Sequence, residues 1–251
     1  MGKLPLEGVR VVDITVIYAG PFGAMNLADW GAEVIRVEST KHWQALTRGA
    51  QPWPSQEIVS NPVRTGGLGT YCNRDVSVRP WNRWTLFNAH ARNKLSCTMD
   101  LARPEGKEIF LRLIAKSDVF LESNAPHAME NLGLTYDVLR EVNPELIMLS
   151  MPGFGNTGPY KYYRALGVHQ EGFIGHTYLR GYPDSDPGTT TTVYHADESA
   201  GATAALAVLA ALHYRKRTGK GQFIDMAQAE TAIPHLGEAV MDYTMNRRVS
   251  P

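Results

Sequence analysis

The stretch VRVVDITVIYAGPFGAMNLADWGAEVIRVE, residues 9–38, decides the fold of this chain. Residues 9–17 are mostly apolar and β-branched, which predicts a buried strand. Gly20 and Pro21 predict the start of a helix, Gly31 predicts its end, and AEVIRVE predicts a second strand. A strand, a helix and a strand within roughly 30 residues form a βαβ unit, and such units build parallel sheets.

The alternation of strands and helices continues along the chain. After Asp100 and Pro104 we expect a helix to about Lys116, followed by a strand at 117–123, a short helix at 134–142 and buried strands near 145–155 and 221–227. This order predicts an α/β fold with an open, mainly parallel, Rossmann-like sheet and helices on both faces. Residues 199–214 are apolar around the whole helical circumference, which predicts a buried helix.

Composition excludes several classes of function. The chain has 251 residues with 25 Lys plus Arg against 25 Asp plus Glu, and no basic block indicates nucleic acid as a partner. No apolar run is long enough to cross a membrane, and the N-terminus lacks the apolar core of a signal peptide. Cys72 and Cys97 form neither a disulfide framework nor a CxxC site. We therefore expect a soluble, reduced, cytoplasmic protein.

Residues 40–86 show no clear periodicity and contain four tryptophans among Gly, Pro, Arg and Asn. So long a loop inside a compact domain tends to be functional or poorly ordered. The tryptophans suggest a bulky or aromatic substrate, although exposed tryptophans also serve contacts between subunits.

The sequence supports neither a dinucleotide-binding motif nor a histidine metal-binding motif. GFGNTG (153–158) matches GxGxxG and follows a predicted strand, but Pro159 and Tyr160 follow it where a dinucleotide site needs a helix. We therefore expect no NAD site there. The histidines form neither HExxH nor HxH, and His169, His176 and His195 fall in different predicted elements, so no metal site is supported.

YHADESAG, residues 194–201, places an acidic pair at the start of the alanine-rich helix. Asp197 is one of the best residue types for capping a helix N-terminus. The same position offers unpaired N–H groups and a partial positive charge, which keep a carboxylate ionised and stabilise an oxyanion beside it. Because carboxylates also act as covalent nucleophiles, both interpretations stay open from the residues alone. Glu198 is better explained as a solvated or paired side chain.

Long segments of the chain resemble the class III CoA-transferases, the formyl-CoA and carnitine CoA-transferase family. The resemblance covers nearly the whole chain in collinear order, through residues 4–38, ARNKLSCTMDLARPEGKEIF, 117–160 and HADESAGATAALAVLAALHYRKRTGKGQFIDMAQAE. It implies an open α/β fold that binds CoA and a dimer of interlocked ring-shaped subunits. Residues 1–225 would form the large CoA-binding domain, and residues 226–251 the start of a linker toward a second domain that is largely absent.

The resemblance also implies a reaction. The aspartate before the alanine-rich helix is the nucleophile in the family, and Asp197 falls on it. CoA would then move between an acyl-CoA and a carboxylic acid through an aspartyl-CoA thioester, with CoA as a substrate and neither a metal nor NAD.

The family's CoA contacts fall on a scattered set of positions. Arg92 and Lys94 could supply charge to phosphates, or could equally be solvated loop cations. Ser123 and Asn124 match only partly, since many relatives have Asn-Phe there. The matching positions are Ile17, Tyr18, Ser39, Met99, Leu101, Ala102, Ser123 and Asn124.

Two departures from the family pattern keep alternatives open. Leu166 and Gly167 stand where relatives carry an aromatic–acid pair, although His169 and Glu171 lie near enough to replace it. The glycine-rich loop that covers the active site in relatives would lie beyond Pro251, so we expect either a fragment or a chain that completes its site with another polypeptide. The alternatives are an acyl-CoA racemase or epimerase, with His169 as the second acid/base, or a CoA-binding, non-catalytic subunit. The expected assembly is a homodimer or a heteromer with a paralogous subunit.

Overall fold

A six-stranded parallel sheet forms the centre of the molecule. The computed structural model describes residues 3–61, 69–182, 184–189 and 194–249. The strands lie in the order β3-β2-β1-β4-β5-β6, and every neighbouring pair is parallel. This is the strand order of the Rossmann fold, so the predicted open Rossmann-like sheet is confirmed. The strands are β1 (Arg10–Asp13), β2 (Glu33–Glu38), β3 (Lys94–Thr98), β4 (Val119–Glu122), β5 (Ile147–Ser150) and β6 (Gln222–Asp225).

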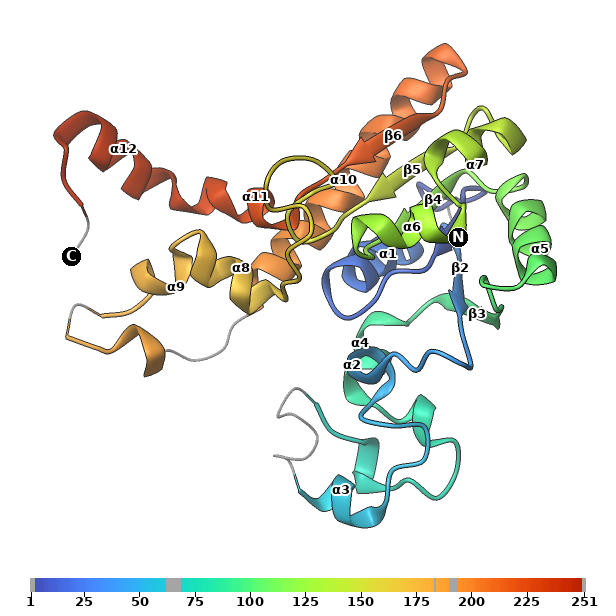
Figure 1. The fold of residues 1–251 in the computed structure, drawn as a ribbon, viewed down its shortest axis with the longest axis horizontal. Helices are drawn as coiled ribbons and strands as arrows, with labels where there is room; N and C mark the ends of the chain where they lie inside the picture. The colour runs from blue at the N-terminus through green and yellow to red at the C-terminus, as the bar shows by residue number, and fades with distance from the viewer. Residues whose placement is uncertain (1–2, 62–68, 183, 190–193, 250–251) are drawn as a thin grey trace.

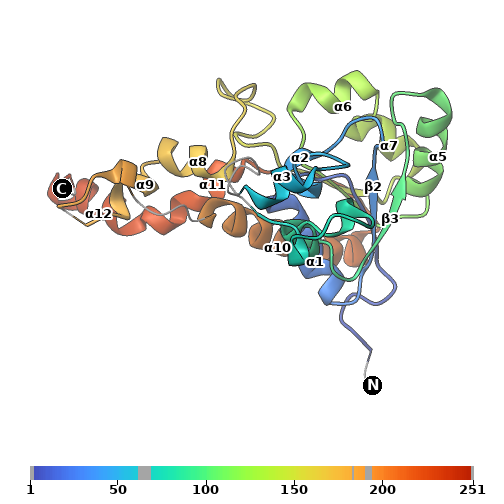
Figure 2. The ribbon, with the colours of Figure 1, turned by 90° about the horizontal axis from the view of Figure 1, so that it is seen from below.

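Helices cover both faces of the sheet, as predicted (Figure 2). On one face lie α1 (Ala19–Asp29) and α10 (His195–Thr218), and on the other α5 (Pro104–Ile114), α6 (Pro126–Leu132) and α7 (Tyr136–Val142). Alternate strand residues divide between two apolar cores: Val11 packs toward α1 and α10, and Val12 toward α5, α6 and α7. Because both faces are covered, all residues of β4 and β5 are buried.

The helices α1 and α10 approach closely through two glycines. A Cβ atom on Gly201 would lie 2.6 Å from the carbonyl oxygen of Ala19, and one on Gly23 would lie 2.9 Å from that of Gly201. Only this face of α10 is buried, because Leu206 on another face is 66% exposed. The prediction that residues 199–214 are buried around the whole circumference is therefore wrong.

Two strands also differ from expectation. The first strand ends at Asp13 rather than Ile17, because the Asp13 carboxylate accepts hydrogen bonds from the N–H and hydroxyl of Thr15 and turns the chain. Strand β3 was not expected at all. It lies at the edge of the sheet and is partly exposed, so its sequence lacks the apolar signal of the central strands.

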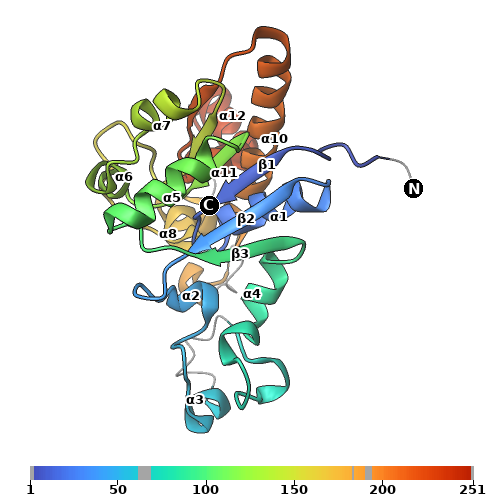
Figure 3. The ribbon, with the colours of Figure 1, turned by 90° about the vertical axis from the view of Figure 1, so that its right-hand side faces the viewer.

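The tryptophan-rich segment between β2 and β3 lies beside the β3 edge (Figure 3). It contains α2 (Ala45–Arg48), α3 (Gln56–Ser60), α4 (Thr85–His90) and short 3₁₀ turns at Cys72–Arg74 and Pro80–Asn82. Val59, Tyr71 and Trp84 form a small apolar core of its own. The described part of this segment is thus built from short helices around buried aromatic rings, with a structure that its sequence did not reveal.

The remaining helices form an arm that extends away from the sheet (Figure 1). They are α8 (Gly167–Phe173), α9 (His176–Leu179), α11 (Gln228–Ala232) and α12 (Gly237–Asn246), with 3₁₀ turns at Pro187–Thr189 and Ile233–Leu236. Pro234 falls in the second of these turns, between two helices. That residues 226–251 lead toward a second domain stays a prediction. Among the helices of the described ranges, none combines the length and apolarity needed to span a membrane.

Candidate active site

Asp197 lies where the starts of three helices meet. It is the third residue of α10 and is 7% exposed. The backbone N–H groups of Ala19, the first residue of α1, and Gly167, the first residue of α8, act on its carboxylate and lower its pKa. These N–H groups have no partner within their own helices, and each helix start carries partial positive charge. The fold therefore concentrates donors on one buried carboxylate.

Burial shifts the acidity of this carboxylate. Burial and, to a smaller extent, the negative charges of Glu171 and Glu198 together raise the pKa of Asp197 to about 6, against the lowering effect of the two N–H donors. Asp197 is thus mainly ionised at neutral pH, yet it is more basic than an exposed aspartate. A carboxylate of this kind is suited to nucleophilic attack.

Glu171, and not Asp197, caps the start of α10. The Glu171 side chain is 1% exposed, and its Oε1 accepts a hydrogen bond from the N–H of Ala196 at 3.1 Å. Its other oxygen, Oε2, accepts from Arg180 at 2.7 Å and lies 3.1 Å from Nδ1 of His176. The N-cap position is Tyr194, whose side chain makes no capping hydrogen bond. The capping explanation for Asp197 is therefore wrong, because a residue distant in sequence supplies the cap.

Gly167 leaves room for the carboxylate. A Cβ atom at this position would overlap Oδ2 of Asp197. The departure from the family pattern at residues 166–167 therefore has a steric consequence here. His169 is exposed, and its Nδ1 accepts a hydrogen bond from the N–H of Leu166 at 3.1 Å. The imidazole thus accepts a hydrogen bond at the start of its own helix. This contact gives no support to the racemase alternative, in which His169 is the second acid/base.

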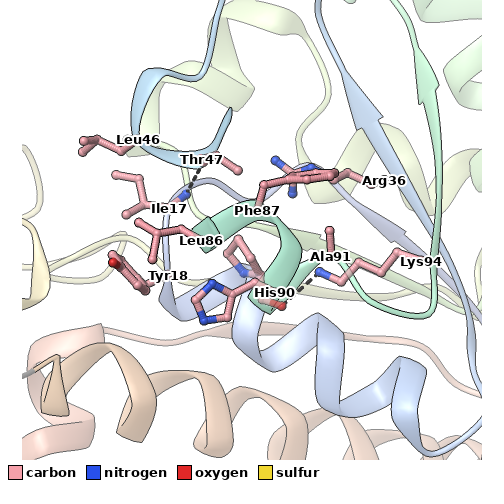
Figure 4. A pocket seen from close by; sticks show the side chains of 11 residues that line it. Ile17, Tyr18, Arg36, Leu46, Thr47, Leu86, Phe87, His90, Ala91 and Lys94 are labelled. Atoms are coloured by element: carbon pink, nitrogen blue, oxygen red, sulfur yellow. Dashed lines mark hydrogen bonds between the residues drawn. The ribbon is translucent and has the colours of Figure 1, made fainter. Parts of the chain in front are cut away.

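Aromatic rings line one side of the site. Tyr18, just before α1, is buried and stacks on Tyr194 with ring centroids 4.5 Å apart. Burial raises the pKa of Tyr18, and Tyr194 and Asp197 contribute to the same shift. Its other neighbour, His90, lies at 5.2 Å between ring centroids, and burial lowers the pKa of His90 to about 4 (Figure 4). Both tyrosines and this neutral imidazole thus form a wall of low polarity near Asp197.

Most of the other predicted CoA contacts lie at the carboxyl edge of the sheet, which is where open α/β sheets bind ligands. Ser123 Oγ accepts a hydrogen bond from the N–H of Val16, and Asn124 donates to Glu122. The residues at the carboxyl ends of β1 to β4 are Ile17, Tyr18, Ser39, Met99, Leu101, Ala102, Ser123 and Asn124. The structure brings these positions to one edge, but their contact with CoA stays a prediction.

A cavity of about 500 Å³ opens beside Ser39. Its walls include the rings of Trp43, Trp53 and Trp81, and Arg48 lies among them. This volume falls within the range of small-molecule sites. Three of the four tryptophans in residues 40–86 thus line one cavity at the ends of β2 and β3.

Arg92 and Lys94 each pair with a carboxylate of the protein. Arg92 precedes β3 at the amino edge of the sheet and pairs with Asp29 at the end of α1. The Lys94 side chain is 2% exposed, and its Nζ donates to Asp13 at 3.0 Å and to the carbonyl oxygen of Pro21 at 2.9 Å. Lys94 is therefore a buried structural cation and not a solvated loop cation, whereas contact of Arg92 or Lys94 with phosphate stays a prediction.

The GFGNTG segment has the conformation of a loop. Residues 152–166 contain turns, and the next helix begins at Gly167, so the prediction that no helix follows these glycines directly is confirmed. Asn156 donates from its backbone and side chain to Asp225, which ties this loop to β6. Within the described residues, no group of three or more His, Cys, Asp or Glu side chains is arranged to hold a metal ion.

Comparisons with known proteins agree on one family. The sequence model of CoA-transferase family III matches residues 6–251. The alpha subunit of succinyl-CoA–L-malate CoA-transferase from Chloroflexus aurantiacus is 34% identical over 96% of this chain and 50% of its own length. The beta subunit of that enzyme is 36% identical over 98% of this chain and 54% of its own length. The chain thus spans about half the length of these curated relatives.

Solved structures support the same assignment. A CAIB/BAIF family protein from Brucella suis superposes with a TM-score of 0.82 at 33% identity, over 99% of this chain and 60% of its own. The α/β architecture described above is therefore that of a known structural group.

Proposed function

The chain belongs to CoA-transferase family III, and from that premise we propose that it moves CoA between an acyl-CoA and a carboxylic acid with Asp197 as the nucleophile. The observation that carries the proposal is the burial of the Asp197 carboxylate against the N–H groups of Ala19 and Gly167. These donors come from helix starts at two separate places in the sequence. Such convergence exceeds what a surface helix cap needs.

The proposed reaction begins with attack of the Asp197 carboxylate on the thioester carbonyl. The carbon–sulfur bond breaks, CoA thiolate leaves, and an aspartyl–acyl anhydride remains. The thiolate then attacks the aspartyl carbonyl and expels the donor's acid as a carboxylate, which leaves an aspartyl-CoA thioester. The acceptor carboxylate attacks this thioester, releases the thiolate and forms a second anhydride. Attack of the thiolate on the acceptor's carbonyl gives the new acyl-CoA and restores Asp197.

The geometry supports each role of Asp197. The two backbone donors hold one orientation of the carboxylate and can stabilise negative charge that develops on its oxygen when the aspartyl carbonyl is attacked. Burial that raises the pKa of Asp197 to about 6 makes the carboxylate more nucleophilic while it stays mainly ionised at neutral pH. Tyr18 and Tyr194 supply a wall that excludes water near the anhydride.

The assembly belongs to the same proposal. Two relatives are named as the alpha and beta subunits of one enzyme, which supports pairing with a paralogous subunit alongside the homodimer. A non-catalytic CoA-binding subunit is the alternative that these names favour. The proposed substrates are an acyl-CoA donor and a carboxylic acid acceptor, and the proposed location is the cytoplasm.

A trapping experiment tests the proposed function. The protein is incubated with a panel of short-chain and dicarboxylic acyl-CoAs, treated with hydroxylamine, digested and mapped by mass spectrometry. We expect a hydroxamate at Asp197, because hydroxylamine attacks the aspartyl carbonyl of the thioester or the anhydride and expels the CoA thiolate or the acid. Modification of another carboxylate would overturn the assignment of Asp197 as the nucleophile. No modification with any acyl-CoA while CoA binds would overturn the proposal and favour the non-catalytic subunit.

A further inference from the structure

The loop between β1 and α1 contains a strained residue. Ile17 has a φ of +66°, in the left-handed region that β-branched residues rarely adopt. The other non-glycine residues with positive φ in the described ranges are asparagines and arginines, namely Asn73, Arg74, Arg79, Asn93 and Arg247. A conformation of this kind persists only where the surroundings hold it, and it often occurs at functional sites.

The partner that holds Ile17 is Thr47. The N–H of Ile17 donates to Oγ1 of Thr47 at 2.7 Å (Figure 4). Thr47 belongs to α2 and is 5% exposed. Since Thr47 comes from the segment between β2 and β3, a residue 30 positions away determines the backbone of this loop.

The helix α2 is itself anchored to the sheet. Arg48 forms an ion pair with Glu38 at the end of β2. Arg36, buried in the same strand, donates to the side chain of Gln44 and to the carbonyl oxygen of Thr15. These bonds fix α2 against β2 and against the loop, so Thr47 is held rigidly enough to impose a conformation.

The loop leads directly to the candidate active site. The N–H of Thr15 donates to Asp13 at 2.9 Å, and that of Val16 donates to Ser123 at 3.0 Å. Ile17 lies two residues before α1 begins at Ala19, whose N–H acts on Asp197. The turn at Ile17 therefore aims the start of α1 at the carboxylate.

We propose that Thr47 is a positioning residue, which holds Ile17 in the left-handed conformation so that α1 presents the Ala19 N–H to Asp197. Its effect on catalysis rests on the proposed function, whereas its effect on the geometry around Asp197 does not. The inference also gives part of the tryptophan-rich segment a role: that segment shapes the site without touching the reacting atoms.

Three variants and a control test this inference. Thr47→Val keeps the shape and removes the acceptor, Thr47→Ser keeps the acceptor, and Ile17→Gly added to Thr47→Val removes the strain. Thr218→Val makes the same chemical change at the far end of α10, where the hydroxyl donates to the carbonyl oxygen of Tyr214. Two quantities are measured: kcat, and the pKa of Asp197. The pKa is obtained from an NMR titration of protein that contains labelled aspartate. Thermal unfolding reports the fold.

In Thr47→Val, we expect the pKa of Asp197 to rise and kcat to fall roughly ten- to hundredfold, because a donor moves away from the carboxylate. Thr47→Ser and Thr218→Val should match the wild type, and Ile17→Gly should recover part of the loss. An unchanged Asp197 titration in folded Thr47→Val, or a Thr47→Ser variant as impaired as Thr47→Val, overturns the inference.

If Thr47→Val does not fold, recovery of the fold by the added Ile17→Gly substitution supports the inference, and continued failure to fold overturns it. A wild type without transfer or adduct counts against the proposed function alone, because the titration still judges Thr47.

Discussion

The pKa values of two buried aspartates in this molecule are shifted in opposite directions. Asp13, at the end of β1, is fully buried and lies 3.0 Å from Nζ of Lys94 and 3.5 Å from Nη1 of Arg36. Burial alone would raise the pKa of Asp13, but the two cations and the Thr15 hydroxyl hold this pKa below its ordinary value. Asp197 is about as inaccessible, yet its pKa is raised to about 6.

The difference lies in the partners. Two cations surround Asp13, whereas Asp197 has two backbone N–H donors, and the charges that act on it most are the acidic ones of Glu171 and Glu198. Paired cations neutralise a buried carboxylate and stabilise the fold when the pair stays intact. Dipoles stabilise the charge only in part and leave the oxygens available for reaction. Burial by itself therefore does not identify a reactive aspartate, and the partners do.

The largest expected effect separates the two residues by activity. Asp197→Asn should lower kcat/KM roughly a thousandfold or more, because an amide cannot attack the thioester. Glu198→Gln is the matched control, since Glu198 is the exposed neighbour in the same turn and should retain most activity. Steady-state kinetics with the best acyl-CoA pair gives the measurement. Activity in Asp197→Asn equal to that of Glu198→Gln would assign Asp197 a purely structural role.

The next effect separates them by stability. Asp13→Asn should destabilise the protein by about 3–5 kcal/mol, because it leaves the buried Lys94 ammonium without its carboxylate. The control is Asp29→Asn, which breaks the exposed pair with Arg92 and should leave the unfolding midpoint nearly unchanged. Urea unfolding at pH 7 measures both. Equal midpoints for the two variants would contradict a structural role for the Asp13–Lys94 pair.

The sequence predicted the architecture because apolar periodicity marks the central strands. β1, β2, β4 and β5 were expected near their observed positions, since strands covered on both faces are continuously apolar or nearly so. The other edge strand, β6, was also expected, because it retains the apolar residues Phe223 and Ile224. KLSCT in β3 lacks this signal because an edge strand faces solvent. The helix at 199–214 was placed correctly, but its alanines fit either a buried or an exposed face, so composition could not show that Leu206 is exposed.

The site was less predictable for a different reason. Asp197 could be proposed from its place before the helix, but its donors lie at residues 19 and 167 and its neighbouring cap at 171. These contacts depend on how α1, α8 and α10 meet, which no local pattern encodes. The same holds for Lys94, whose side chain is directed by strand pairing into the core, and for Thr47, which reaches Ile17 across a loop. A single sequence indicates the residue types, whereas the tertiary fold selects their partners.

The smallest expected effect is a difference in how stability depends on pH. The folded pKa of Asp197, about 6, exceeds its ordinary value of 3.8. The folded protein therefore binds more protons than the unfolded chain between these values, and its stability falls as the pH rises through them. Ionised Asp197 should thus destabilise the wild type by up to about 3 kcal/mol at pH 7, and by almost nothing near pH 4. For Asp13, whose folded pKa is lowered, the sign reverses: its stabilisation is present at neutral pH and is lost as the pH falls through the folded value.

Unfolding free energies at several pH values between 4 and 8 measure this difference directly. Asp197→Asn removes the ionisable group, so the free energy of the variant relative to the wild type should rise with pH across the range from about 4 to 6 and level off above it. The amide turns an NH₂ group toward at least one backbone donor, which costs stability, but that cost is the same at every pH and does not alter the slope. Relative to the wild type, Asp13→Asn should instead keep a nearly constant disadvantage across this range, because the folded pKa of Asp13 lies below it. A flat difference for Asp197→Asn would mean that its carboxylate is held as firmly in the charged form as that of Asp13, and the contrast between dipole-held and cation-paired aspartates would fail.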